Sequence, residues 1–178
     1  SDYNHPSIDV DEYINFKRDL EAIIDTDKYQ VLLKPHQVVY KEMKKAGLLS
    51  DSLIPAFIDT NELLAITDIL ISDYSSIFYD YLATDKPVLF YIPDIDEYKN
   101  YRGLYLSPDQ LPGPCLTNVD QIGCVINNLE PHINKYSHAY KKAKEFACPM
   151  DDGLVAKRIV DIVFYNKTCS DNGRDYNL

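Results

Sequence analysis

The chain has 178 residues, enough for one domain with a proper core, and its apolar fraction of 46% is ordinary for a globular protein. Its formal net charge of −10 argues against a general nucleic-acid-binding or anionic-membrane surface, because either would need a concentrated basic patch. No run approaches the roughly 18 apolar residues of a membrane span, and the amino terminus has no charged-then-apolar signal pattern. We therefore expect a soluble chain.

The cysteines indicate neither a metal site nor a disulfide framework. The 4 cysteines lack the paired spacing of a zinc site and are too sparse for a disulfide scaffold. This usage is typical of a reduced, cytoplasmic environment. We expect no bound metal and no cofactor.

The first third of the chain is predicted to contain two helix–strand pairs. Apolar residues at helical spacing predict a helix over 13–24, and a β-rich run predicts a strand over 29–33, which Pro35 would end. A second helix is predicted over 38–45, and a second strand over 53–58.

Alternation of helices and strands continues beyond residue 60. The pattern predicts helices over 61–67 and 77–82 and strands over 69–71 and 88–92. Alternation at these short intervals is the pattern of right-handed βαβ crossovers. The fold class expected is therefore α/β, with a parallel sheet covered by helices on both faces.

The chain is predicted to stay irregular from Pro93 to about Thr117, because prolines and polar residues dominate there. Arg102 lies in this loop among several tyrosines. It could stack on an aromatic ring or contact a phosphate, or it could simply be solvated.

Three more helices are predicted, over 119–129, 131–146 and 153–164. We expect one domain over 1–166 and a disordered tail over 167–178.

The turn between the strand at 69–71 and the following helix carries Ser75 and Ser76. A helix begins with unpaired N–H groups and the positive end of its dipole, and two hydroxyls add further donors for a phosphate. The alternative is that the serines only cap the helix. The expected position of the turn, at the carboxyl end of a parallel strand, favours a phosphorylated ligand.

Three further residues are candidates for the same site. Asp80 lies one helical turn after Ser76, where it would accept a hydrogen bond from a ligand hydroxyl or merely complement the helix dipole. His36 follows the strand at 29–33 and could donate to a phosphate or move a proton, although such a histidine is more often a turn residue. Lys34 adds the positive charge that a pyrophosphate needs.

Several ordered motifs together resemble the CDP-glycerol glycerophosphotransferase family, the teichoic acid primases and polymerases. These motifs are Lys34-Pro35-His36, Ser72–Ser76 with Asp80, Lys86–Tyr91, and Asp96-Glu97-Tyr98 leading to Arg102–Tyr105. Pro112-Gly113-Pro114 and the later Asp152-Gly153 with Arg158 match the same pattern in order and approximate spacing. The resemblance spans roughly residues 29 to 164.

The resemblance implies a GT-B enzyme built from two Rossmann-like halves, of which this chain is the carboxyl-terminal, donor-binding half. It implies that Ser75 and Ser76 contact the donor phosphates, that Asp80 binds a donor hydroxyl, and that His36 faces the pyrophosphate as the catalytic candidate. Lys34 and Arg102 complete the implied substrate-binding set.

The implied reaction transfers glycerol phosphate from CDP-glycerol to a polyol-phosphate chain and releases CMP. A lipid-linked acceptor would bind through an amino-terminal half that this chain lacks, no nucleic acid is involved, and the whole protein would be peripheral on the cytoplasmic face of the membrane. Two alternatives stay open at this point. One is another GT-B transferase that uses a nucleotide sugar or CDP-ribitol, and the other is a noncatalytic nucleotide-binding module.

Overall fold

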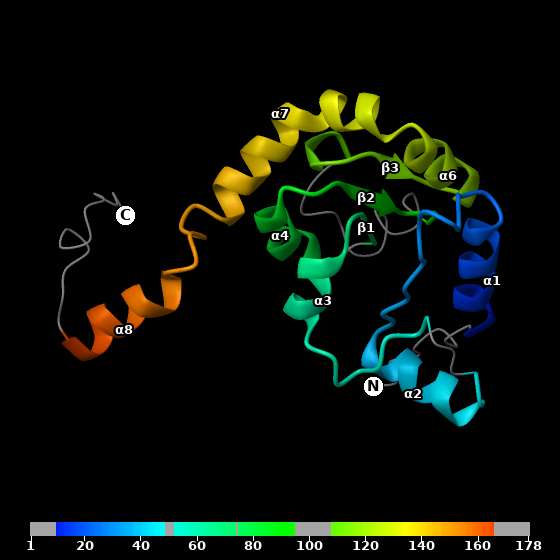
Figure 1. Ribbon diagram of the computed structural model, residues 1–178, viewed down its shortest axis with the longest axis horizontal. Helices are drawn as coiled ribbons and strands as arrows, with labels where there is room; N and C mark the ends of the chain where they lie inside the picture. Colours follow the sequence, from blue (N-terminus) through cyan, green and yellow to red (C-terminus); the bar gives the residue numbers. More distant parts are fainter. Residues whose placement is uncertain (1–9, 49–51, 74, 95–107, 166–178) are drawn as a thin grey trace, which may run out of the picture.

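The computed structural model describes residues 10–48, 52–73, 75–94 and 108–165. Its centre is a three-stranded parallel sheet with the order β1-β2-β3, formed by Leu70–Ser72, Val88–Tyr91 and Cys115–Leu116 (Figure 1). Ile71 pairs with Leu89, and Tyr91 pairs with Leu116. The parallel arrangement confirms the α/β fold class.

The strands predicted at 29–33 and 53–58 are wrong as continuous strands. The two segments share a single parallel bridge, between Leu33 and Leu53, in which the Leu33 N–H donates to Ser52 and the Ile54 N–H donates to Leu33, both at 2.8 Å. The next bond of this ladder would come from the N–H of residue 35, and proline has none, so Pro35 ends the pairing on the carboxyl side.

The sequence also missed β3, which lies inside the region predicted to be irregular. It is only two residues long and directly follows Pro114, so its pattern is too short to reveal a strand. The neighbouring strand defines it, because the Phe90 N–H donates to the Pro114 carbonyl and the Ile92 N–H donates to the Leu116 carbonyl.

The helices agree with the sequence-based expectation to within a few residues. They are α1 Val10–Glu21, α2 Gln37–Lys45, α3 Thr60–Ile66, α4 Ile77–Tyr81, α6 Val119–Asn127, α7 Leu129–Ala147 and α8 Val155–Tyr165. Short 3-10 turns occur at Leu82–Thr84, directly after α4, and at Pro108–Gln110. Asp59 caps α3, because its carboxylate accepts the backbone N–H groups of Asn61 and Glu62.

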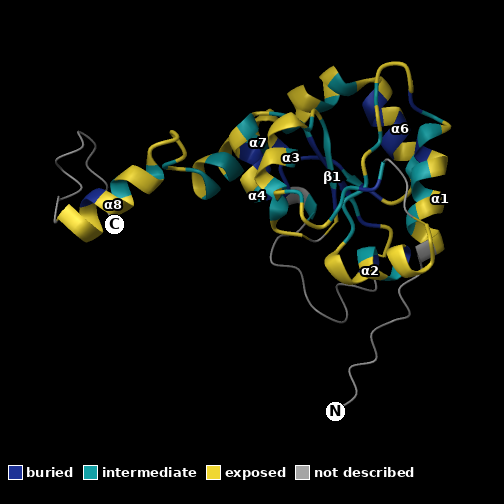
Figure 2. Ribbon diagram, turned by 60° about the horizontal axis from the view of Figure 1, so that its bottom comes forward, coloured by how far each residue is buried: buried dark blue, intermediate teal, exposed yellow. Residues whose placement is uncertain are grey.

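Two apolar clusters pack on opposite faces of the sheet. Phe90 belongs to the first, together with Tyr81 at the end of α4, and α7 covers this face. Leu89 belongs to the second, together with Leu20 of α1 and Ile122 of α6. Adjacent residues of β2 thus point to opposite faces, and Figure 2 shows the buried residues gathered around the sheet. Helices on both faces confirm that part of the expectation.

Helix α8 extends away from this body (Figure 1). Its apolar side chains are exposed, including Ile159 at 55% and Phe164 at 75%. The Arg158 Nη1 group donates to both carboxylate oxygens of Asp152 at 2.8 Å and joins the first turn of α8 to the preceding link. No helix in the described residues combines the length and apolarity needed to cross a membrane. The division at residue 166 stays a prediction, because residues 166–178 lie outside the described ranges.

Replacement of Gly113 by alanine should destabilise the chain strongly. A Cβ at Gly113 would fall inside the contact distance of the Val88 backbone carbonyl, so the backbone before β3 would have to move. We expect Gly113→Ala to lower the free energy of unfolding by about 3 kcal/mol, measured by urea denaturation.

Gly47→Ala is the matched control. Gly47 has a φ of +72°, and a methyl group added there would meet nothing within 4 Å, so the substitution meets backbone strain alone. It should cost only about 1 kcal/mol. Equal losses in the two variants would show that the close approach at Gly113 is unimportant for stability.

Candidate functional site

The serine pair lies at the carboxyl end of β1, as the sequence predicted. Ser72 ends the strand and is only 7% exposed, whereas Ser75 and Ser76 are exposed on the turn into α4. The Ser75 hydroxyl accepts the Ile77 N–H at 3.4 Å. The Ser76 side chain makes no capping hydrogen bond, so its hydroxyl is available to a ligand.

Asp73 is a residue of this turn to which the sequence motifs gave no role. Its carboxylate accepts the Ser75 N–H at 2.9 Å. An aspartate two residues before a serine N–H is a common turn pattern, and this was the signal that could have revealed the contact. Any anion that binds the Ser75 N–H must share it with this carboxylate.

His36 is the N-cap residue of α2 and is exposed. Its Nδ1 atom accepts the Val38 N–H at 3.4 Å, and its carbonyl accepts the Tyr40 N–H at 3.0 Å. Because Nδ1 acts as the acceptor, the neutral imidazole carries its proton on Nε2. His36 thus caps a helix and still has one N–H donor for a phosphate oxygen.

Lys34 is half-buried, and its ammonium donates to the Ile58 carbonyl at 3.3 Å. This bond ties the end of the Leu33 segment to the chain just before α3. The ammonium keeps two further N–H donors, because a lysine can make three hydrogen bonds. Its positive charge therefore remains usable beside His36.

Asp80 is exposed on α4. Burial is the main cause that raises the pKa of the Cys148 thiol, at the end of α7. Hydrogen bonding and charge at Asp151 raise this pKa further, and the charge of Asp80 adds a smaller part. The role of Asp80 toward a donor hydroxyl stays a prediction. Arg102 lies outside the described residues.

Tyr13 of α1 connects the serine turn with the helix that His36 caps. Burial raises the pKa of the Tyr13 hydroxyl, and the nearby charges of Asp73 and Glu12 raise it further. The Tyr13 ring packs against a cluster that contains Val39 of α2. The turn after β1 and the start of α2 therefore share a neighbour.

In the part of the chain that the structure describes, the hydrogen bonds of His36 and of the two serines are all local.

An aromatic pair stands at the same strand ends. The Phe16 and Tyr91 rings lie 4.9 Å apart between centroids, joining α1 to the last residue of β2. Burial, followed by the charge of Glu12, raises the pKa of Tyr91. In the sequence Phe16 is recognisable only as part of a helical stripe, and its position at the rim needed the fold.

This arrangement suits a phosphorylated ligand with hydroxyl groups. Backbone N–H groups, serine hydroxyls, an imidazole and an ammonium are all donors to phosphate, and carboxylates nearby can accept hydroxyl hydrogen bonds. Within the described ranges, no group of three or more His, Cys, Asp or Glu side chains could hold a metal ion.

Comparisons with known proteins concern the family and the fold of the chain. A family model described as CDP-glycerol:poly(glycerophosphate) glycerophosphotransferase matches residues 4–165. The teichoic acid glycerol-phosphate transferase of Staphylococcus aureus is 29% identical over 156 residues, which cover 85% of this chain and 39% of that protein. The teichoic acid poly(ribitol-phosphate) polymerase of Bacillus spizizenii is 32% identical over 146 residues, covering 78% and 22% respectively.

The structure resembles that of the wall teichoic acid polymerase TagF. The two superpose with a TM-score of 0.70 and 29% sequence identity, over 84% of this chain and 37% of the TagF chain. A TagF structure soaked with CDPG gives a TM-score of 0.69. The chain thus spans well under half the length of these relatives.

The parallel sheet and its covering helices define a Rossmann-like domain of the kind found in GT-B enzymes. With the match over residues 4–165, the chain belongs to the CDP-glycerol:poly(glycerophosphate) glycerophosphotransferase family, a family of enzymes. The resemblance inferred from the sequence motifs is therefore confirmed. The roles of individual residues stay predictions.

Substitution of His36 should separate its capping role from any role in binding. His36→Ala removes the acceptor for the Val38 N–H and should lower the free energy of unfolding by about 1 kcal/mol. His36→Asn keeps an N-cap acceptor and should cost only a few tenths of a kcal/mol. Urea denaturation measures both, and equal losses would contradict the capping role.

Proposed function

We propose that this chain is the nucleotide-donor half of a glycerophosphotransferase that transfers glycerol phosphate from CDP-glycerol to a polyol-phosphate chain and releases CMP. The observation that carries the proposal is the exposed serine turn at the carboxyl end of β1, inside a chain whose family match covers residues 4–165. Ligands of open α/β sheets bind at this edge. The TagF structure soaked with CDPG supports a cytidine-containing donor.

The pyrophosphate of the donor would lie against the turn after β1. The hydroxyls of Ser75 and Ser76 and the backbone N–H groups at the start of α4 would donate to its oxygens. His36 would donate from Nε2, and Lys34 would supply positive charge from the neighbouring segment. Asp80 would accept a hydrogen bond from a hydroxyl of the donor, and Arg102 would contact the donor from its loop.

The reaction would be an in-line displacement at the phosphorus of the glycerol phosphate group. An acceptor hydroxyl forms the new P–O bond, the bond to the bridging pyrophosphate oxygen breaks, and CMP leaves with the bonding electrons. Negative charge grows on the departing phosphate, so fixed donors at the serine turn and at His36 stabilise the transition state more than the ground state. The general base for the acceptor hydroxyl would come from outside this chain.

The acceptor would bind elsewhere in a longer protein. The relatives extend well beyond the region that this chain matches, which leaves room for a second Rossmann-like half that binds a lipid-linked polyol-phosphate chain. Such an acceptor would keep the whole protein peripheral on the cytoplasmic face of the membrane. No nucleic acid enters this reaction.

A second candidate donor is CDP-ribitol. The polymerase of Bacillus spizizenii that is 32% identical to this chain is named for ribitol phosphate. The two donors share the cytidine and the pyrophosphate and differ only in the polyol. The serine turn and His36 would serve both equally, and contacts to the polyol would choose between them.

Binding of CDP-glycerol should raise the thermal midpoint of the chain, and this rise should depend on the serine turn. At about ten times its Kd the ligand stabilises by about 1.4 kcal/mol, or about 3–6 °C for a chain of this size. The shift should fall to near zero in Ser75→Ala and in His36→Asn, because Ser75→Ala removes a hydroxyl donor and His36→Asn replaces the imidazole Nε2–H with a shorter amide that does not reach the same point.

Ser137→Ala is the matched control, since Ser137 is an exposed serine on α7, away from the serine turn. It should keep the full shift. UDP-glucose should give no shift, and CDP-ribitol tests the second candidate directly. An unchanged shift in both site variants, or an equal shift with UDP-glucose, would overturn the assignment of the donor site.

A further inference from the structure

Phe57 is the most exposed large apolar residue in the described ranges, with 85% of its surface accessible. It belongs to none of the three apolar clusters that form the core. A phenylalanine ring stabilises a fold in proportion to the apolar area that it buries, and here that area is small. The ring is therefore available to contact another molecule.

A short turn holds this ring in place. The Ile58 N–H donates to the Pro55 carbonyl at 3.1 Å, so Phe57 is the third residue of a four-residue turn. The proline ring fixes the φ angle where the turn begins, and Asp59 caps α3 directly after the turn ends. Because the backbone is defined on both sides of Phe57, little conformational freedom is lost when a ligand contacts its ring.

Phe57 lies on the same side of the Leu33–Leu53 bridge as the candidate residues Lys34 and His36. The bridge is parallel, so the segments that follow its two leucines leave it in the same direction. Lys34 and His36 follow Leu33 within three residues, and Phe57 follows Leu53 within four. The exposed ring and the two side chains proposed to bind phosphate therefore lie at one edge of the fold.

Lys34 keeps positive charge close to the turn that carries the ring. Its ammonium donates to the Ile58 carbonyl at 3.3 Å, and Ile58 directly follows Phe57, at a Cα spacing of about 3.8 Å. In a nucleotide only the ribose separates the phosphate from the base. A nucleotide whose phosphate contacts Lys34 therefore has its base within reach of the Phe57 ring.

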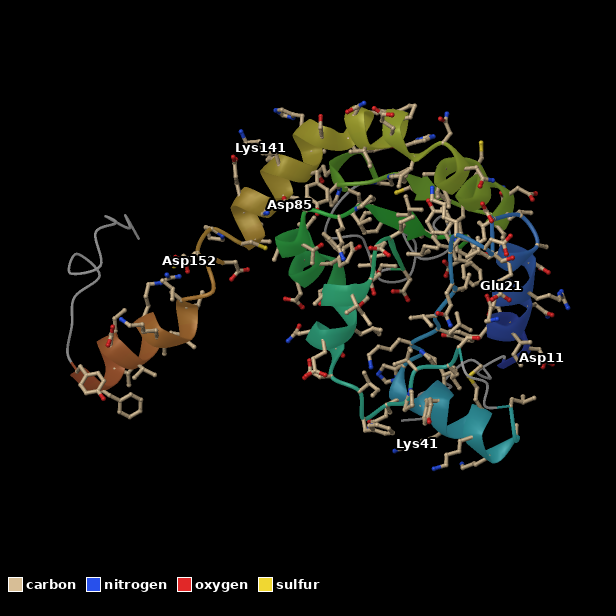
Figure 3. The ribbon with its side chains drawn as sticks, in the orientation of Figure 1. Asp11, Glu21, Lys41, Asp85, Lys141 and Asp152 are labelled. Carbon is tan, nitrogen blue, oxygen red and sulfur yellow. The ribbon has the colours of Figure 1, made fainter. Side chains whose placement is uncertain are left out.

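Two other phenylalanines are almost as exposed but occupy different surroundings. Phe146, at 79%, lies near the end of α7, and Phe164, at 75%, lies on α8. Figure 3 shows Lys41 on α2 and Lys141 on α7 at separate ends of the body, and Figure 1 shows α8 farther still from α2. Exposure is thus common to three rings, and proximity to Lys34 distinguishes Phe57.

We propose that Phe57 is the ring on which the pyrimidine base of the nucleotide donor stacks. This inference rests on the proposed function, in which Lys34, His36 and the serine turn bind the donor pyrophosphate. A base presents a flat π-face, and stacking on an aromatic side chain strengthens binding by about tenfold or more. The ring contacts the part that CDP-glycerol and CDP-ribitol share, so it adds affinity for both donors alike.

The chain contains no tryptophan, which permits a direct test of stacking. Phe57→Trp keeps a flat ring and introduces a single tryptophan into the full chain, and a base stacked on it should quench its fluorescence. CMP should quench this emission saturably. Phe146→Trp, at a similarly exposed position on α7, is the matched control and should show no quenching. Equal quenching in the two variants would overturn the proposal.

Removal of the ring tests its contribution to affinity. Phe57→Ala should raise the Kd of CMP and of CDP-glycerol about tenfold or more, whereas Phe57→Tyr and Phe146→Ala should change it less than twofold. Inorganic pyrophosphate has no base, so it should bind Phe57→Ala and the unmodified chain equally. An equal loss for pyrophosphate and CMP would show that the ring supports the turn and does not contact the base.

The outcomes separate this inference from the proposed function. If neither CMP nor CDP-glycerol raises the thermal midpoint of the unmodified chain, the proposed function fails and the stacking role fails with it. If both ligands raise it, Ser75→Ala abolishes the rise and Phe57→Ala leaves it unchanged, the donor site stands. The role of Phe57 alone is then overturned.

Discussion

The pairing of β2 with its two neighbours is the interaction on which the rest of this structure depends. Val88, Leu89 and Phe90 are each at most 2% exposed, and they contact the apolar clusters on both faces of the sheet. Parallel pairing with β1 on one side and β3 on the other aligns the strand ends. The carboxyl end of β1 therefore presents the serine turn at a fixed position beside β2.

Much of this fold could be predicted from the sequence because its helices keep a periodic apolar pattern and β2 is a continuous apolar run. The serine turn was also predictable, since an apolar strand, two serines and a helical pattern follow one another without interruption. For the segments 29–33 and 53–58, the sequence pattern could not decide whether a strand forms. Their composition favours strands, but only Leu33 and Leu53 pair, and whether a strand forms depends on its partners. Two-residue β3 has no sequence period at all.

The candidate site was predictable as a set of residue types and less so as an arrangement. His36, Lys34 and the serines follow segments whose ends the sequence located, but their local bonds did not follow from it. Asp73 holds the Ser75 N–H, and Ile58 accepts from Lys34, which the motifs alone did not indicate. Tyr13 and Phe16 reach the strand ends because α1 packs across the sheet, a tertiary relation that spacing along the chain does not encode.

The attachment of α8 gives the chain two regions of unequal resistance to proteases. The apolar face of α8 is exposed, and the Arg158–Asp152 pair fastens its first turn to a link that is itself largely on the surface. Arg158 lowers the pKa of Asp152, so acid weakens this fastening only once the carboxylate is protonated. Cleavage between residues 149 and 154 would release α8 and leave both apolar clusters and the sheet whole, since none of the cluster residues lies beyond Cys148.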